Sequence, residues 1–168
     1  DTETEERMLR VIKELAEDPE RKVDVVSTFL GAHAVPKEYK GRTAEYVDLI
    51  IKEMLPRFRD MAEFCDIFTE KNVFELEDSR RLLEAAREAG YKLKMHADEI
   101  VSLGGAELAA DLGAVSADHL LHVSDEGIRR MAESGTVATL LPLTAFALKE
   151  EFAPARKFID AGCTVALA

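Results

Sequence analysis

The chain has 168 residues, of which 47% are apolar and 33% are charged, and this composition predicts one globular domain with a real core. It excludes a disordered chain, a collagen and a disulfide-stapled scaffold. The net charge of −11 repels phosphate, so we expect no nucleic acid and no anionic membrane as partner. The two cysteines, Cys65 and Cys163, lack metal-ligand spacing and indicate a reduced, cytoplasmic setting.

The first half of the chain alternates between stretches of helical period and short apolar runs. The periodic stretches predict helices over 2–17, 44–61 and 78–89. The apolar runs predict strands over 25–30, 64–68 and 91–95. Pro56 is expected to kink or split the second helix, and Gly90 stands where a glycine commonly ends a helix.

The second half continues the same alternation. Helices are predicted over 106–112, 124–135 and 153–161, and strands over 115–118, 136–141 and 163–168. The longest uncharged stretch, 134–148, is shorter than the ~20 residues of a membrane helix and contains Pro142. We therefore expect this stretch to form a buried strand followed by a loop. The apolar residues of 163–168 predict that the last strand is buried as well.

Strands and helices that alternate in this way predict an α/β fold with a parallel sheet, either doubly wound or closed into a (β/α)8 barrel. A complete barrel needs eight strands and at least ~200 residues, more than the chain has. The chain begins with a helix that follows no strand and stops within an apolar strand. We therefore expect residues 1–168 to be a segment of a single TIM-like barrel domain, about six of its eight βα units.

Three of the four histidines come at the carboxyl ends of predicted strands, namely His33, His96 and His119. These ends of parallel strands share one face of the sheet, where active sites of α/β proteins are built. A single histidine in such a place is more often a structural residue, but three on three strands favour a functional site. His122 lies in the loop after His119, and we expect it to be a solvated loop residue.

The segment 94–99, with the sequence KMHADE, places an imidazole and two carboxylates at the end of one strand. An imidazole is the commonest metal ligand in proteins, and a nearby carboxylate can orient it or move protons. The alternative is that Asp98 and Glu99 only open the next loop, because the spacing is not that of the HExxH zinc motif. Gly104 and Gly105 match no phosphate-binding motif and predict a tight entry into the following helix.

Five sequence strings in collinear order resemble the imidazolonepropionases, a family of the amidohydrolase superfamily, and the resemblance extends from about residue 25 to residue 168. The strings are STFLGAHAVP at 27–36, KMHADE at 94–99, LGGAELAA at 103–110, GAVSADHLL at 113–121 and APARK at 153–157. The resemblance implies a metal-dependent hydrolase that opens the cyclic amide of 4-imidazolone-5-propanoate to N-formimidoyl-L-glutamate in histidine degradation. It further implies one divalent metal, zinc or iron, and a cytoplasmic homodimer.

The same resemblance implies a role for four residues. His96 matches the metal-ligand histidine of the fifth barrel strand, and His119 matches the sixth-strand histidine beside the attacking water. Glu99 matches the glutamate that contacts the substrate ring and helps to move protons. His33 matches a histidine that contacts the substrate. His122 stands where the family often has a tyrosine, which argues against a role for it.

The chain also departs from the family pattern. The HxH pair of metal ligands, the last aspartate ligand and the substrate-contacting arginine and tyrosine do not occur in it, so we expect the segment alone to be inactive. One alternative is another amidohydrolase, such as a purine or pyrimidine deaminase or a different cyclic-amide hydrolase. A second alternative is a complete doubly wound module that binds a small molecule and catalyses nothing.

Overall fold

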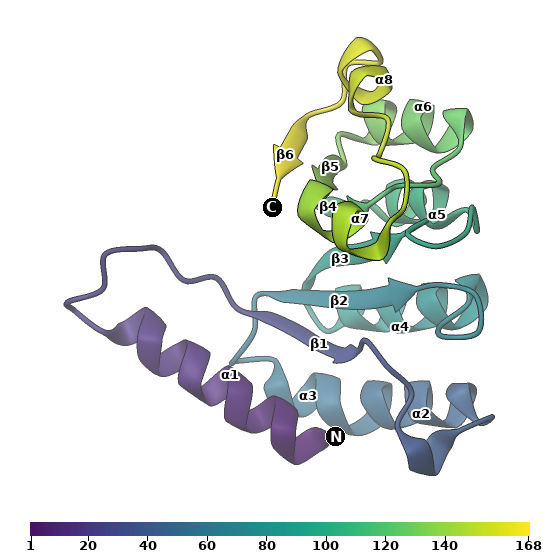
Figure 1. The fold of residues 1–168 in the computed structure, drawn as a ribbon. Helices are drawn as coiled ribbons and strands as arrows, with labels where there is room; N and C mark the ends of the chain where they lie inside the picture. Colours follow the sequence, from purple (N-terminus) through teal and green to yellow (C-terminus); the bar gives the residue numbers. More distant parts are fainter.

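In the computed structural model, which describes all 168 residues, six strands form one parallel sheet. The strands are β1 (Thr28–Ala32), β2 (Phe64–Thr69), β3 (Lys92–Ala97), β4 (Ser116–His119), β5 (Val137–Leu140) and β6 (Val165–Leu167). Figure 1 shows them following one another across the sheet in the order in which they occur in the chain. A doubly wound sheet reverses its strand order at a switch point, whereas the wall of a barrel does not. The strand order therefore favours the barrel over the doubly wound alternative.

Every connection between consecutive strands contains at least one helix, as expected for βα units. The helices are α1 (Thr2–Glu17), η1 (Lys37–Tyr39), α2 (Thr43–Leu49), η2 (Ile50–Met54), α3 (Leu55–Phe58), α4 (Leu76–Glu88), α5 (Gly105–Leu112), α6 (Asp125–Ser134), α7 (Pro142–Leu148) and α8 (Ala155–Asp160). None of them combines the length and the apolar character that crossing a bilayer requires.

Two sequence predictions for the helices are confirmed in detail. The first helix has the predicted limits, with Asp1 as its N-cap, where the Asp1 carboxylate accepts the backbone N–H of Thr4. The helix predicted over 44–61 is split into α2, one π-helical turn (η2) and α3. Pro56, which has no N–H to donate, comes directly after the π turn, and the backbone stays helical through the junction.

Three predictions for strands and loops are wrong. The loop expected after residue 141 is helix α7, because Pro142 occupies a position that favours the start of a helix. The strand predicted over 25–30 is displaced to Thr28–Ala32, since pairing with β2 begins only at Thr28. The last strand has only three residues and is not buried, with Leu167 74% exposed.

The core lies between the sheet and the helices. Along β3, Leu93, Met95 and Ala97 are buried, and β3 packs against α4 and α5. The alternating residues Lys94 and His96 lie on the opposite face of the strand, because successive side chains of a strand point to opposite sides. The same alternation places Asp66 and Phe68 of β2, and Ser116 and Asp118 of β4, on the face of His96.

Candidate active site

The structure brings His33, His96 and His119 together at the carboxyl edge of the sheet. His33 directly follows β1, His96 is the fifth residue of β3, and His119 is the last residue of β4. The ring centroids of His33 and His96 are 5.6 Å apart, and those of His96 and His119 are 5.1 Å apart. Three imidazoles from three strands thus form one continuous cluster.

Phe68, which sequence reasoning did not identify, completes one side of this cluster. It pairs with His96 in the register of β2 and β3, and its ring stacks on His33 with the centroids 5.3 Å apart. His33 is exposed, so its imidazole has one face on Phe68 and remains accessible to a ligand. An apolar residue in an apolar strand carries no sequence signal for such a role.

His119 is held in an unusual backbone conformation. Its φ angle is +75° and that of the buried Leu120 is +60°, in the left-handed region that residues with a side chain rarely adopt. The His119 ring is buried, and burial together with the neighbouring His96 lowers its pKa to about 4. His119 is therefore a neutral imidazole at pH 7 and is able to accept a proton.

Glu99 lies beside His119, with Oε1 at 3.3 Å from Nδ1. The approach lacks hydrogen-bond geometry, so the buried Nδ1 has no hydrogen-bond partner in the protein. Glu99 is 8% exposed, and burial raises the pKa of its carboxyl group. A carboxyl group with a raised pKa next to a neutral imidazole is suited to moving protons at pH 7.

Two further buried carboxylates hold the loop that carries Glu99. Asp98 accepts four backbone N–H groups at 2.8–3.1 Å, from residues 103, 104, 105 and 106 at the start of α5. Glu70, just after β2, accepts the N–H groups of Ile100 at 2.9 Å and Val101 at 3.4 Å. Asp98 thus holds the loop that follows β3, as the structural alternative expected of it, whereas Glu99 faces His119.

The glycine pair makes this loop compact, as the sequence predicted. Gly104 has a φ angle of +93°, and a Cβ atom on Gly105 would lie 2.9 Å from the Cβ of Ala97. Because no side chain fits at Gly105, the start of α5 can approach the end of β3 closely enough for Asp98 to reach it.

Carboxylates from the two neighbouring strands flank His96, and sequence reasoning missed both of them. An Asp66 oxygen lies 3.1 Å from His96 Nδ1, and ligand atoms of Asp66, His96 and Asp118 all lie within 4.8 Å of one another. Burial alone would lower the pKa of His96, but the hydrogen bond and charge of Asp66 outweigh it and raise the pKa. Asp66 interrupts the apolar strand β2, and this was a signal that could have identified it.

The donor set around His96 fits a divalent transition metal. An imidazole with nearby carboxylates provides the ligands that zinc and iron commonly use. The Nδ1 atom of His96 contacts Asp66, and no protein group hydrogen-bonds its Nε2 atom. His96 therefore retains one ring nitrogen with which to bind a metal.

His122 stands apart from the three clustered histidines. Its side chain is 33% exposed, and its Nε2 atom lies 3.7 Å from a carboxylate oxygen of Glu150, which follows α7. The Nε2 atom is itself buried and has no hydrogen-bond partner in the protein, so the expectation of a solvated loop histidine is only partly met, and the absence of a role for His122 stays a prediction.

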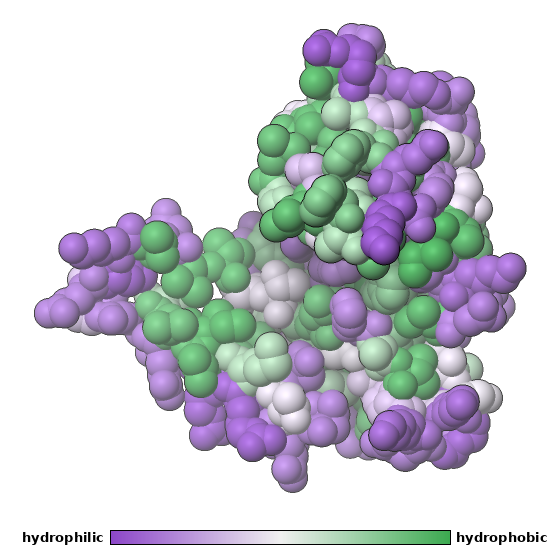
Figure 2. Space-filling view, in the orientation of Figure 1, coloured by the Kyte–Doolittle hydropathy of each residue, from purple (hydrophilic) through white to green (hydrophobic).

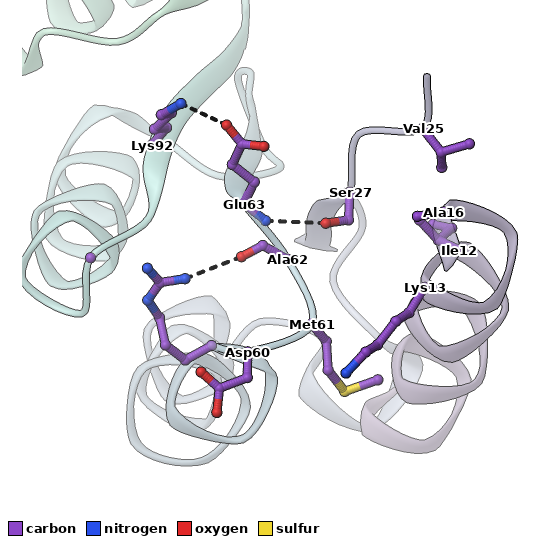
Figure 3. A pocket seen from close by; sticks show the side chains of 12 residues that line it. Ile12, Lys13, Ala16, Val25, Ser27, Asp60, Met61, Ala62, Glu63 and Lys92 are labelled. Atoms are coloured by element: carbon purple, nitrogen blue, oxygen red, sulfur yellow. Dashed lines mark hydrogen bonds and ion pairs between the residues drawn. The ribbon is translucent and has the colours of Figure 1, made fainter. Parts of the chain in front are cut away.

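A cavity of about 590 Å³ lies at the other end of the strands (Figure 3). Its lining includes Ser27, Glu63 and Lys92, at or just before the starts of β1, β2 and β3, and the ion pair of Lys92 with Glu63 measures 2.6 Å. In barrel enzymes the amino ends of the strands serve stability, and chemistry takes place at the carboxyl ends. The cavity is therefore not the candidate active site.

The sequence is similar to imidazolonepropionases over its whole length. It is 64% identical over 170 aligned residues to the imidazolonepropionase of Bacteroides thetaiotaomicron, which covers 100% of this chain and 41% of that protein. It is 57% identical over 169 residues to that of Clostridium tetani, with 99% of this chain and 40% of that protein covered. The chain thus spans about 40% of the length of these curated relatives. No protein-family model matches the chain.

Solved structures confirm the fold. The guanine deaminase of C. acetobutylicum, with guanine in its active site, superimposes with a TM-score of 0.74 at 13% identity, over 100% of this chain and 43% of that one. An amidohydrolase from Burkholderia ambifaria with bound Zn superimposes with a TM-score of 0.68 at 19% identity, over 99% of this chain and 46% of that one. The predicted α/β fold is therefore correct, and the six parallel strands superimpose on part of the fold of these larger proteins.

Proposed function

We propose that this chain is the central-to-C-terminal part of the single barrel domain of an imidazolonepropionase. The proposed activity is hydrolysis of the cyclic amide of 4-imidazolone-5-propanoate to N-formimidoyl-L-glutamate. The observation that carries the proposal is the 57–64% identity to imidazolonepropionases along the whole chain. The clustering of His33, His96, Glu99 and His119 supports it, because these are the residues to which the resemblance assigns roles.

We further propose that the complete protein uses one divalent metal, zinc or iron, and that His96 is one of its ligands. Bound zinc in a structural neighbour of the same fold and the ligand set around His96 support this. Such a metal lowers the pKa of water and polarises the amide oxygen.

The residues of this chain would then act in sequence around the substrate. The neutral His119 accepts a proton from the attacking water, since its low pKa keeps it unprotonated at pH 7. Glu99 accepts a ring N–H of the substrate, and it passes the proton taken up by His119 to the nitrogen that leaves the amide carbon. His33, stacked on Phe68, contacts the substrate at the exposed side of the cluster.

The substrate is a small molecule in this proposal, and the protein is a homodimer in the cytoplasm. The alternative is a purine deaminase or another hydrolase of the same fold. One observation favours it, namely that the guanine deaminase shares this arrangement of strands. A non-enzymatic doubly wound module is not retained, because the strand order has no reversal.

An assay of the full-length protein that contains this chain tests the proposal. The metal-loaded protein should consume 4-imidazolone-5-propanoate and form N-formimidoyl-L-glutamate, identified by mass spectrometry. Guanine and adenosine serve as competing substrates, with ammonia release as the signal. Release of ammonia from a purine without turnover of the imidazolone would replace the proposed function by the alternative.

A further inference from the structure

The carboxylate of Asp66 has no cationic side chain as partner. Asp66 lies on β2, and its side chain is 3% exposed. Its charged or chargeable neighbour within 4.0 Å is His96, and the backbone N–H of Ile67 donates to the same oxygen at 2.7 Å. A buried carboxylate without a lysine or arginine is costly, so its contact with His96 requires an explanation.

Asp118, on the other side of His96, has different partners. Its Oδ2 atom lies 3.3 Å from the ammonium group of Lys94, and the hydroxyl group of Ser116 donates to Oδ1 at 2.9 Å. Its charge is thus balanced within the protein, whereas the oxygen of Asp66 is directed at the His96 ring. The two flanking carboxylates therefore have separate roles.

We propose that Asp66 is a positioning residue, which accepts the Nδ1–H of His96 and so directs its Nε2 atom toward the metal. This inference rests on the proposed function. An ionised carboxylate can only accept a hydrogen bond, so the proton of the neutral imidazole must be on Nδ1. Nε2 then presents its lone pair, and the rotation of the ring is fixed. A carboxylate behind a metal-ligand histidine also makes the imidazole a stronger ligand.

The competing explanation is that Asp66 itself binds the metal. Ligand atoms of Asp66, His96 and Asp118 lie within 4.8 Å of one another, so one metal ion could bind to all three residues. The two explanations predict different absorption spectra of the bound metal. Removing a ligand changes the coordination number of the metal, whereas removing a positioning residue does not.

The test uses the full-length protein with its metal removed, as wild type, Asp66→Asn and Asp66→Ala. Zinc affinity is measured by competition with a chelator, a readout that needs no substrate. Loss of the hydrogen bond should weaken zinc affinity about 10- to 100-fold in Asp66→Ala. The zinc affinity of Asp66→Asn should lie between those of Asp66→Ala and wild type, because the amide oxygen can still accept the Nδ1–H of His96. Asp111→Asn, at an exposed residue of α5, is the matched control and should keep wild-type affinity.

Cobalt-loaded variants separate a positioning residue from a ligand. At saturating cobalt, the visible absorption of Asp66→Ala should match that of wild type, and saturating metal should restore most of kcat. Unchanged zinc affinity in Asp66→Ala, or an altered cobalt spectrum at saturation, would overturn the proposal. If Asp66→Ala does not fold, the same comparison is made with Asp66→Asn. Failure of wild type to turn over imidazolonepropanoate, with the affinity differences intact, would refute the proposed function alone.

Discussion

The backbone conformation at His119 determines the orientation of the imidazole ring as much as the neighbouring side chains do. Positive φ angles at His119 and Leu120 place two non-glycine residues in succession in the left-handed region. Each such residue costs about 1–3 kcal/mol, and strain of this kind persists where the surrounding structure holds it. Here it turns the chain sharply at the end of β4, which brings the imidazole next to Glu99.

In the full-length protein, His119→Ala and Glu99→Ala should each lower kcat by roughly 100-fold or more, because each removes a group positioned for proton transfer. The metal content should survive both changes, since neither residue is assigned as a ligand. His96→Ala should differ by losing metal together with activity. Steady-state kinetics and metal analysis of the purified variants check this, and a His96→Ala variant with full metal content would contradict it.

The exposed His33 is expected to affect substrate binding more than chemistry. His33→Ala should mainly raise KM, because the proposed function assigns this ring to substrate contact and not to proton transfer. His122→Ala is the control and should leave both constants nearly unchanged. Kinetics at varied substrate concentration separate the two constants. Damage by His122→Ala equal to that of His119→Ala would show that the wrong histidines have been assigned to the site.

At the level of elements, the connection between β3 and α5 depends on one carboxylate. The Asp98 side chain satisfies four backbone N–H groups, and its own φ angle is +49°. Unpaired N–H groups at the start of a helix attract an anion, which the helix dipole also favours. Without Asp98 these four groups would lose their acceptor, and those of Gly105 and Ala106 are buried.

Asp98→Ala should therefore lower the free energy of unfolding by about 2 kcal/mol or more, the scale of a lost charged hydrogen-bond acceptor. Urea unfolding of the full-length protein measures this. Asp111→Ala, at the exposed end of the same helix, should change the free energy by less than ~1 kcal/mol. Equal effects of the two changes would contradict the role given to Asp98.

Ionisation of Tyr46 at alkaline pH is expected to weaken the packing of α2 on β1. The Tyr46 hydroxyl donates to the carbonyl of Gly31 at 2.8 Å. Burial, with smaller contributions from the acidic Glu5 and Glu38, raises its pKa to about 12. The unfolded chain, with a tyrosine pKa near ~10, loses its proton first. Stability is therefore intact below pH ~10 and falls as the pH rises toward 12.

Unfolding by urea between pH 8 and pH 11 checks this expectation. Tyr46→Phe cannot ionise, so its stability should fall less steeply above pH ~10 than that of wild type. The comparison is needed because burial also raises the pKa of Tyr91, which contributes in the same direction. Parallel pH curves for the two proteins would refute the assignment to Tyr46.

At the level of the whole molecule, the sheet has two open edges, β1 and β6. Figure 2 shows hydrophobic surface near both ends of the sheet, and the exposed apolar residues include Val23, Val26, Leu143, Phe146, Phe152 and Leu167. Open edges and apolar patches are surfaces on which other chains associate.

We therefore expect the 168 residues, expressed alone, to associate or to be only marginally folded. Light scattering should report species larger than one chain, and thermal unfolding should be broad. A monomer that melts cooperatively would contradict this expectation.

The amino-acid sequence by itself determined the alternation of strands and helices, because the period of the apolar residues and the residues that cap helices can be recognised within a short segment. It also determined which histidines follow strands, since a strand end needs only an apolar run to locate it. Helix α7 escaped prediction because an uncharged stretch with a proline has no decisive local pattern.

Only the tertiary structure decided the partners of those histidines. Asp66 contacts His96, which is 30 residues away in the sequence. Lys94, on the neighbouring strand, balances the charge of Asp118. Strand register places these groups together, and a shift of either strand by one residue would turn its side chains to the other face of the sheet. The sequence therefore specified the chemistry that is available in the site, and the fold decided which groups act on one another, because contact depends on distances that only the folded chain creates.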